Sequence, residues 1–414
     1  MNHINISPAI PVPNVISVVG PRRLLVGHLN LSNRSCKLAL SWRLRPSVLV
    51  RYGGDNIEIV EKRGKDGDEA DDGFYMIRCV ELARKAVGCT SPNPMVGCVI
   101  VKDGIVVGEG FHPKAGQPHA EVFALRDAGE VAAMNSTAYV SLEPCNHYGR
   151  TPPCTESLIR AGVKRVVVGM VDPNPIVASK GVEKLREAGI SVSVGIEELL
   201  CRKLNEAYIH KMLNGKPFVT LRYSLQSADV TVGKMDPQLL RENDCIVISS
   251  KSKMLLPLLQ ERKKPLIIIV HNCKDSSPLC VPAFLMDDMT RVVFFLEKNS
   301  VIEPDMESNL KKQGVEMVVF DEINLYSIIE YCSGQGMCSI LFDLLDRDDV
   351  DCCGVLESIV DGDVQKVVVE AVEGETEQFW GIKVGRKTLK VKNVQVKSVE
   401  EDRVLVEGYV SQIL

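Results

Sequence analysis

One histidine and two cysteines between residues 119 and 154 constrain the fold more than any other feature of the sequence. His119 begins the segment His-Ala-Glu, and Cys145 and Cys154 enclose the segment Cys-Asn-His-Tyr-Gly-Arg-Thr-Pro-Pro-Cys. An imidazole and two thiolates are three of the four ligands of a catalytic zinc ion, whose fourth position is kept for water. A chain with this pattern must fold so that three separate segments meet around one metal ion.

A carboxylate lies close to the first of these ligands. Glu121 follows His119 by two residues. Zinc lowers the pKa of a bound water to about 7, and a carboxylate that is not a ligand can take the water's proton and deliver it to a leaving amine. We therefore predict a zinc-dependent hydrolytic site with Glu121 as the catalytic acid and base. The alternative is a structural zinc site or a set of scattered reduced cysteines, but structural sites normally have four protein ligands.

The spacing of the two cysteines narrows the class of site. The zinc-binding pattern of deaminases commonly ends with Pro-Cys-x-x-Cys, in which two residues separate the cysteines. Here eight residues separate Cys145 from Cys154. The longer insert, together with Thr-Ser-Pro-Asn-Pro-Met-Val-Gly at 90–97 and Asp-Pro-Asn-Pro at 172–175, resembles the pyrimidine deaminases of riboflavin biosynthesis, and most of all their monofunctional plant type. The resemblance implies a Zn²⁺ cofactor and the substrate 2,5-diamino-6-ribosylamino-4(3H)-pyrimidinone 5′-phosphate, which would be attacked at C2 and lose ammonia.

The same resemblance implies a set of substrate-binding residues. Asn93 offers a donor and an acceptor to a base edge, and an arginine or a histidine can bind phosphate oxygens. The alternative for the loop residues is that they only shape their turns. The implied contacts are Asn93, His112, His147, Arg150, Asp172 and Asn174.

The first 54 residues differ in charge from the rest of the chain. They contain seven Lys or Arg residues and no Asp or Glu. Since the whole chain carries −5, the remaining residues carry −12. A basic, serine-bearing, acid-free start is typical of an organelle transit peptide, so we predict a transit peptide and linker over 1–70, and the resemblance favours the chloroplast stroma over the mitochondrion. The alternative is a basic tail without a targeting role.

Composition also limits the partners. The chain has 14 cysteines without a regular paired spacing, which favours a reducing compartment over a disulfide framework. No apolar run approaches the roughly 20 residues needed to span a bilayer. The acidic body and the absence of Cys-x-x-Cys disfavour a nucleic-acid deaminase. We predict a small-molecule pyrimidine nucleotide as the substrate, no membrane or nucleic-acid partner, and a homo-oligomer.

Hydrophobic periodicity predicts an α/β sandwich around a mixed sheet over 71–212, and the resemblance implies that this sandwich has the cytidine-deaminase-like fold. We expect Asp71 or Asp72 to cap the first helix, and Lys-Asp-Gly at 102–104 to join two strands as a hairpin. The zinc site should lie at the ends of the central strands. The other expected elements are strands at 95–101, 105–111, 164–170 and 191–195, and helices that begin near His119, Cys154 and Lys180.

The second half, 213–414, resembles the reductase domain that bacterial relatives fuse to this deaminase. The match begins at 216–225 and then fails, because Gln-Ser-Ala-Asp-Val at 226–230 replaces a polar, Trp-containing segment and about a dozen residues are missing. No G-x-G-x-x-G motif follows. Strand-like runs lie at 245–249, 265–271, 290–296, 315–320 and 366–372, and two short alternating runs at 389–392 and 394–397 indicate closing strands at a sheet edge.

We therefore predict a dihydrofolate-reductase-like α/β domain that lacks reductase activity and binds no nicotinamide cofactor, so that a separate reductase acts on the product. Two further alternatives stay open from the sequence. One is a bifunctional deaminase–reductase that uses NADPH, and the other is a non-catalytic zinc scaffold.

Overall fold

The structure is a computed structural model of the 414-residue chain. It describes residues 48–53, 56–61, 69–148, 152–175, 178–224, 235–250, 265–271, 291–298, 300, 302–312, 314–344, 354–357, 359–372, 381–384, 386–400 and 403–414. Most of the predicted transit peptide lies outside these residues. So does the segment 226–230, where the resemblance to the reductase domain ends.

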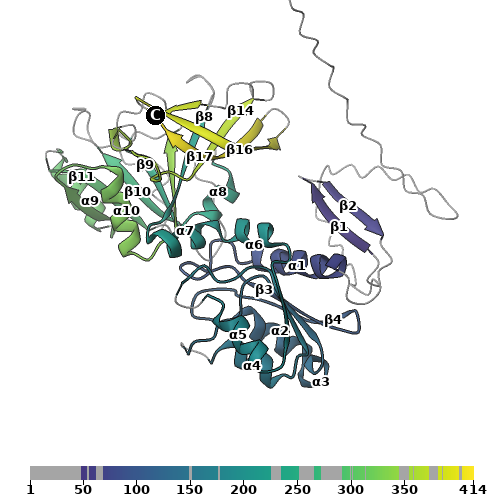
Figure 1. Cartoon of the computed structure of the whole chain (residues 1–414). Coiled ribbons are helices and arrows are strands. Elements are labelled where there is room, and N and C mark those ends of the chain that lie inside the picture. The colour runs from purple at the N-terminus through teal and green to yellow at the C-terminus, as the bar shows by residue number, and fades with distance from the viewer. Residues whose placement is uncertain are drawn as a thin grey trace, which may run out of the picture. The chain divides into compact units, whose positions relative to one another are not determined.

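A five-stranded mixed sheet forms the centre of the first domain (Figure 1). Its order is β4-β3-β5-β6-β7, with β3 antiparallel to β4 and β5, and β5, β6 and β7 parallel. This confirms the expected mixed sheet. The strands are β3 (Gly97–Lys102), β4 (Ile105–Phe111), β5 (Thr137–Val140), β6 (Arg165–Val168) and β7 (Ser191–Val194).

Helices cover both faces of this sheet. The helices are α1 (Glu69–Arg84), α2 (Ala120–Ala128), α3 (Glu130–Ala133), α4 (Cys154–Arg160), α5 (Lys180–Glu187), α6 (Glu198–Leu204) and α7 (Glu206–Asn214). Alternate residues of β3 point to opposite faces. Val99 packs with Met76 of α1, whereas Ile100 packs with Ala124 of α2. The result is the predicted α/β sandwich, in which α2, α4 and α5 share one face.

The hairpin between β3 and β4 forms as the sequence predicts. Asp103 and Gly104 have φ values of 52° and 72°, which are the left-handed values that a two-residue type I′ turn requires. Glycine adopts this conformation without steric cost, and aspartate tolerates it better than most residues. The short turn fixes β4 beside β3, and the chain then continues to the segment that carries His119.

The expected cap of the first helix is wrong. Helix α1 begins at Glu69, so Asp72 lies inside its first turns. The Asp72 carboxylate is buried and accepts two hydrogen bonds from the Arg165 guanidinium, at 2.9 and 2.6 Å, and one from the Tyr139 hydroxyl at 2.9 Å. A buried carboxylate is stabilised by a bidentate arginine partner. The Asp72 side chain therefore binds Arg165 and Tyr139, which are distant in the sequence, and does not cap the helix.

The second domain is built on a ten-stranded sheet. Its strands are β8 (Phe218–Ser224), β9 (Cys245–Ser249), β10 (Leu266–His271), β11 (Val292–Glu297), β12 (Glu316–Phe320), β13 (Ser339–Leu344), β14 (Lys366–Val372), β15 (Gly381–Val384), β16 (Lys387–Glu400) and β17 (Arg403–Ile413). The order is β12-β11-β10-β9-β13-β8-β14-β17-β16-β15. Strands from β12 to β14 along this order are parallel, and the last three are antiparallel to their neighbours.

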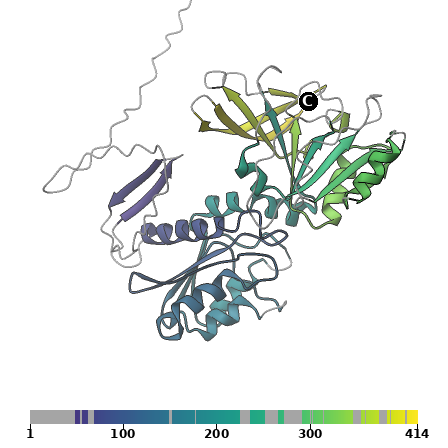
Figure 2. The ribbon, with the colours of Figure 1, turned by 180° about the vertical axis from the view of Figure 1, so that it is seen from behind.

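Strands β9, β10, β11 and β13 are buried on both faces, which explains their continuous apolar runs. The helices described here are α8 (Pro237–Glu242), α9 (Pro304–Lys312) and α10 (Leu325–Gly334). Ile268 of β10 packs in one cluster with Ile328 of α10, whereas Ile267 packs in another with Leu310 of α9. Figure 2 shows the green strands and helices of this region from behind.

The two alternating runs near the C-terminus were predicted as separate edge strands, and this is wrong in two respects. Both belong to β16, whose pairing with β17 is irregular between Lys392 and Gln395. Asn393 lies there with φ 54°, so a bulge accounts for the change of phase in the sequence pattern. The edge of the sheet is β15.

The range predicted as leader and linker contains one described feature. Strands β1 (Val48–Gly53) and β2 (Asn56–Glu61) pair antiparallel as a two-stranded sheet. Among the described residues, no helix has the length and apolar character that crossing a membrane requires.

Candidate active site

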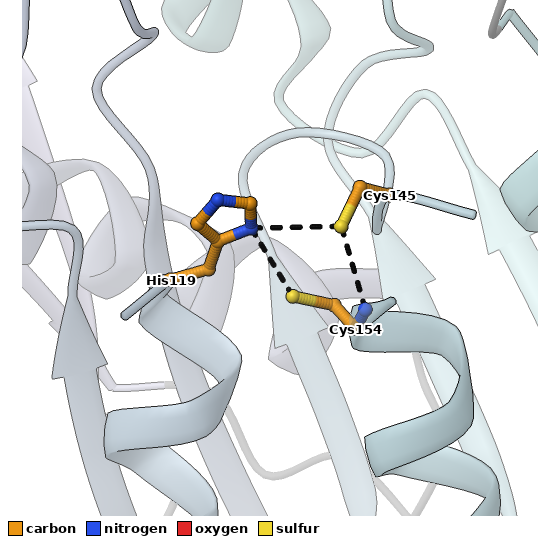
Figure 3. A group of neighbouring side chains, drawn as sticks. All are labelled: His119, Cys145 and Cys154. Atoms are coloured by element: carbon orange, nitrogen blue, oxygen red, sulfur yellow. Dashed lines mark hydrogen bonds between the residues drawn. The ribbon is translucent and has the colours of Figure 1, made fainter. Parts of the chain in front are cut away.

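Three chain segments bring the predicted metal ligands together (Figure 3). His119 precedes the first residue of α2, Cys154 is the first residue of α4, and Cys145 lies on the loop that follows β5. The His119 Nδ1 atom is 3.5 Å from the Cys145 Sγ atom and 3.3 Å from the Cys154 Sγ atom. All three ligand atoms lie within 4.8 Å of one another, which is close enough to share one ion.

The protonation of the two thiols favours a cation at this position. The pKa of Cys145 is lowered to about 4, first by the hydrogen bond with the Cys154 thiol and then by His119. The pKa of Cys154 is raised, first by its hydrogen bond with Cys145 and then by burial, so that the two thiols do not both ionise easily. A divalent ion removes this conflict because it stabilises both thiolates. One imidazole nitrogen and two sulfurs form a donor set that suits zinc.

Glu121 lies in the first turn of α2, directly beside the ligands. Its side chain is buried, with 3% of the residue exposed. Burial raises the pKa of Glu121 to about 7, and the negative charge of Cys145 adds to this effect. A carboxyl group that exchanges its proton near neutral pH can act both as a base and as an acid.

Two of the predicted substrate contacts adjoin the metal ligands. The His112 Nδ1–H group donates to the Pro118 carbonyl at 3.0 Å, which leaves Nε2 to accept from the Asn93 side-chain amide at 3.1 Å. Burial lowers the pKa of His112, so its ring is neutral and this tautomer is consistent. The His112 and His119 rings lie edge to face, with centroids 5.4 Å apart. Asn93 is therefore connected to the metal site through one histidine.

Asp172 and Asn174 lie on the loop that follows β6. The Asp172 carboxylate accepts the Asn174 N–H at 2.9 Å, and the Tyr208 hydroxyl lies 3.5 Å away. Burial raises the pKa of Asp172. The exposed His147 side chain lies on the loop that follows β5. Arg150 lies outside the described residues.

Glu143 is a residue of this site that the sequence reasoning missed. Its buried carboxylate accepts four backbone N–H groups, at 3.1 Å from Asp172, 3.0 Å from Ser179, 2.9 Å from Gly181 and 3.0 Å from Val182. It thereby joins the segment of the ligand Cys145 to the loop of Asp172 and to the start of α5. The signal in the sequence was an acid directly before Pro144-Cys145 at the end of an apolar strand.

Asn205 and Tyr208 were also missed. The Asn205 side chain accepts the Met95 N–H at 2.8 Å and donates to the Met95 carbonyl at 2.9 Å, so it supports the loop that carries Asn93. Tyr208 adjoins Asp172. Asn205 lies 110 positions from Met95, and Tyr208 lies 36 positions from Asp172. No local sequence pattern marks contacts over such separations.

The described part of the second domain has a buried charged group of a different kind. Arg222 of β8 is fully buried, and its guanidinium lies 3.0 Å from the Asp343 carboxylate of β13 and 2.5 Å from the Glu370 carboxylate of β14. Burial opposes its charge, but the two carboxylates outweigh this and raise the pKa of Arg222. The group is a buried ion cluster within the sheet, in which one guanidinium contacts two carboxylates.

Comparison with known proteins agrees with the geometry of the first domain. Residues 69–170 match the family model described as the cytidine and deoxycytidylate deaminase zinc-binding region. The fold and the site thus define a zinc-dependent deaminase with the cytidine-deaminase fold.

Longer similarities extend across both domains. The chloroplastic riboflavin biosynthesis protein PYRD of Arabidopsis thaliana is 48% identical over 86% of this chain and 87% of its own length. The PYRD protein of Zea mays is 51% identical over 83% of this chain and 89% of its own length. The chain belongs to the PYRD/RibD family of riboflavin biosynthesis proteins.

A solved structure shows a similar two-domain fold. The diaminohydroxyphosphoribosylaminopyrimidine deaminase/5-amino-6-(5-phosphoribosylamino)uracil reductase of Thermotoga maritima has a TM-score of 0.64 and 28% identity, and the match covers 82% of this chain and 99% of that one. The expected classes of both domains, a cytidine-deaminase-like domain followed by a reductase-like domain, are confirmed.

Proposed function

We propose that this chain deaminates 2,5-diamino-6-ribosylamino-4(3H)-pyrimidinone 5′-phosphate to 5-amino-6-ribosylamino-2,4(1H,3H)-pyrimidinedione 5′-phosphate and ammonia. The observation that carries the proposal is the meeting of His119, Cys145 and Cys154 beside a buried Glu121. The similarity to riboflavin biosynthesis proteins over most of the chain supports this particular pyrimidine nucleotide.

The proposed reaction assigns a separate role to the metal ligands, to Glu121 and to His112. His119, Cys145 and Cys154 would hold a zinc ion, which would supply the Lewis acidity that makes water a nucleophile near neutral pH. Glu121 accepts the proton of that water and delivers it to the departing amine, since its pKa of about 7 allows both transfers. The neutral His112 keeps the Asn93 amide group oriented through its Nε2 atom.

We assign substrate binding to the contact residues predicted from the sequence. Asn93 uses its amide nitrogen on His112, so its side-chain oxygen is the acceptor for an amino group of the pyrimidine. Asp172 and Asn174 suit ribose hydroxyls. His147 and Arg150 suit the 5′-phosphate because both donate and both carry or can carry positive charge.

The experiment that tests this function follows ammonia release from the diaminopyrimidine nucleotide by the purified full-length chain loaded with zinc. Stoichiometric formation of the 5-aminouracil nucleotide is the expected result. Absence of turnover in a zinc-loaded, folded protein would contradict the proposal, and turnover that survives removal of the metal would contradict the role of the ion.

A second candidate function is a bifunctional deaminase–reductase, favoured by the fused Thermotoga maritima relative that matches both domains. We propose instead that the domain over 213–414 has no reductase activity and that a separate reductase acts on the product. The replacement of the polar segment at 226–230 and the absence of a G-x-G-x-x-G motif support this proposal.

NADPH binding separates the two candidates. Calorimetry at up to about 1 mM NADPH should give no saturable heat, whereas even a weak site of roughly −4 kcal/mol would be half filled there. Oxidation of NADPH in the presence of the deaminated product would establish the bifunctional alternative.

We also propose that the basic segment 1–54 is a chloroplast transit peptide and that the enzyme works in the stroma as a homo-oligomer. The charge of the segment and the chloroplastic relatives support the targeting. A fluorescent reporter fused behind residues 1–70 should enter the plastid, and its retention in the cytosol would contradict the assignment. Sedimentation of the chain beginning at Asp71 would give the oligomeric state.

A further inference from the structure

The loop that carries Asn93 is bonded to the second domain. The Ser91 hydroxyl donates to the Asp244 Oδ2 atom at 2.7 Å. The same oxygen accepts the backbone N–H of Cys338 at 2.8 Å. Asp244 directly precedes β9 and Cys338 directly precedes β13. One carboxylate oxygen thus connects the substrate loop to two strands of the second sheet.

Asp244 is held firmly on its own side of this contact. Its backbone N–H donates to the Ser339 hydroxyl at 3.0 Å, and β9 pairs with β13 in a region where every strand residue is buried. The Cys338 thiol adds a weak hydrogen bond to the Pro92 carbonyl at 3.7 Å. The Asp244 carboxylate is therefore fixed by the sheet that its backbone adjoins.

The backbone at the contact leaves no room for adjustment. A Cβ atom at Gly88 would lie 2.4 Å from the Arg241 carbonyl oxygen, and Gly88 has φ +73°. Only glycine satisfies both the close approach and the left-handed conformation without strain. Gly88 thus permits the close approach of α8 to the segment before Ser91.

From Ser91 the contact continues to the metal site. The Asn93 N–H donates to the Thr90 carbonyl at 2.8 Å, which makes residues 90–93 a single turn. The Asn93 amide then contacts His112, whose ring lies against the ligand His119. A shift of Ser91 would therefore move Asn93 relative to the metal ligands, because the turn moves as a unit.

We propose that Asp244 is a positioning residue of the deaminase: through Ser91 it holds Asn93 where the pyrimidine binds. The inference rests on the proposed role of Asn93 as a substrate contact. It gives the second domain a part in deamination that requires no nicotinamide chemistry, since the domain supplies a fixed anchor that the loop lacks by itself.

A contact that only joined two domains would affect stability and leave substrate binding unchanged. A positioning contact must raise KM, because Asn93 is needed to bind the base and takes no part in proton transfer. The ratio of the effects on KM and kcat therefore distinguishes the two roles.

The test uses Ser91→Ala, Asp244→Ala and the double variant in the full-length, zinc-loaded chain, with ammonia release from the diaminopyrimidine nucleotide as the assay. Each single change should raise KM about 3- to 10-fold and change kcat less than about 2-fold, with zinc content unchanged. The double variant should raise KM no more than the larger single change, because both remove one contact. Asp244→Asn keeps an acceptor oxygen and should restore KM to within about 2-fold of the original value.

Two controls separate this inference from its alternatives. Asp236→Ala removes the cap of α8, where the carboxylate accepts the Gln238 N–H at 2.8 Å, and it should leave KM unchanged while it weakens the same domain. Ser91→Ala tests the contact from the deaminase side should Asp244→Ala unfold the second domain.

Asn93→Ala provides the remaining comparison. If it leaves KM unchanged, the proposed substrate contact is wrong and the inference is wrong with it. If Asn93→Ala raises KM but Ser91→Ala and Asp244→Ala do not, or if their effects multiply in the double variant, only the role of Asp244 is overturned.

Discussion

Two buried ionisable groups of this chain, one in each domain, have different surroundings. In the first domain, burial raises the pKa of Glu121 to about 7 and lowers the pKa of His112. In the second domain, Arg222 lies between Asp343 and Glu370, and its charge is retained and neutralised. The first arrangement allows a proton to move near neutral pH, whereas the second holds charges fixed.

This difference separates a site for chemistry from a site for structure. A general acid and base needs a pKa near the working pH, and groups with such pKa values concentrate at active sites. In a buried ion cluster, attraction between opposite charges offsets the desolvation cost of each group. Removing one member leaves the others buried without that attraction, which is destabilising. The location agrees with this division, because Glu121 lies at a helix start and Arg222 lies within a central strand.

The largest expected effect comes from a metal ligand. Cys145→Ser should reduce bound zinc to less than about a tenth of one ion per chain and reduce ammonia release to background, because a hydroxyl is a poor ligand for zinc at neutral pH. Metal analysis of the purified protein measures this. Cys89→Ser, which changes a cysteine of the same domain outside the ligand group, is the matched control. Full zinc and full activity in Cys145→Ser would remove the ligand assignment.

The second effect concerns the proton carrier. Glu121→Gln should keep zinc and fold while kcat falls by about 10²–10⁴, because the amide keeps the shape but cannot carry the proton. The exposed Glu130 on α3 offers the control Glu130→Gln, which should leave kcat unchanged. A loss below about tenfold would show that another group performs the transfer.

The third effect tests the ion cluster of the second sheet. Arg222→Met should lower the free energy of unfolding by about 3–5 kcal/mol, because two buried carboxylates lose their partner. Thermal or denaturant unfolding measures the loss, while kcat of the folded protein should stay within about twofold. Arg291→Met is the comparison, since that arginine pairs with Glu316 at an exposed place and should contribute less than about 1 kcal/mol. Equal losses in both variants would contradict the distinction between the two sheets.

The smallest effect concerns Glu143. Replacement by alanine removes the acceptor of four backbone N–H groups and should cost about 2–3 kcal/mol of stability, with KM raised as the Asp172 loop loosens. Glu187→Ala, at the exposed end of α5, should change neither quantity. Unchanged stability in Glu143→Ala would show that water replaces the carboxylate in this first-domain site.

Much of the first domain follows from local sequence. The turn at Asp103-Gly104, the helices that begin beside His119 and Cys154, and the strand at 165–168 were all predicted correctly, because each depends on residues within a few positions. The metal ligands could also be named from the sequence, since zinc accepts few residue types and their spacing is restricted.

Other contacts were decided only by the tertiary structure. Asp72 was expected to cap a helix, but Arg165 on a distant strand binds it. The second domain's alternating runs were expected to form separate strands, but a bulge at Asn393 joins them into one. In the first case a distant partner outweighs a local rule. In the second case one strand continues through an irregularity in its pairing, which the sequence pattern does not distinguish from the end of a strand.

The sequence by itself determined which side chains are the candidates to hold the metal and to move the proton, because those tasks require particular residue types. The tertiary structure alone decided what fixes them: Glu143 binds backbone N–H groups, which every residue except proline offers, and Asp244 reaches Ser91 across 153 positions. Contacts to common groups over long separations leave no pattern in the chain, and only the folded sheet brings them within hydrogen-bonding distance.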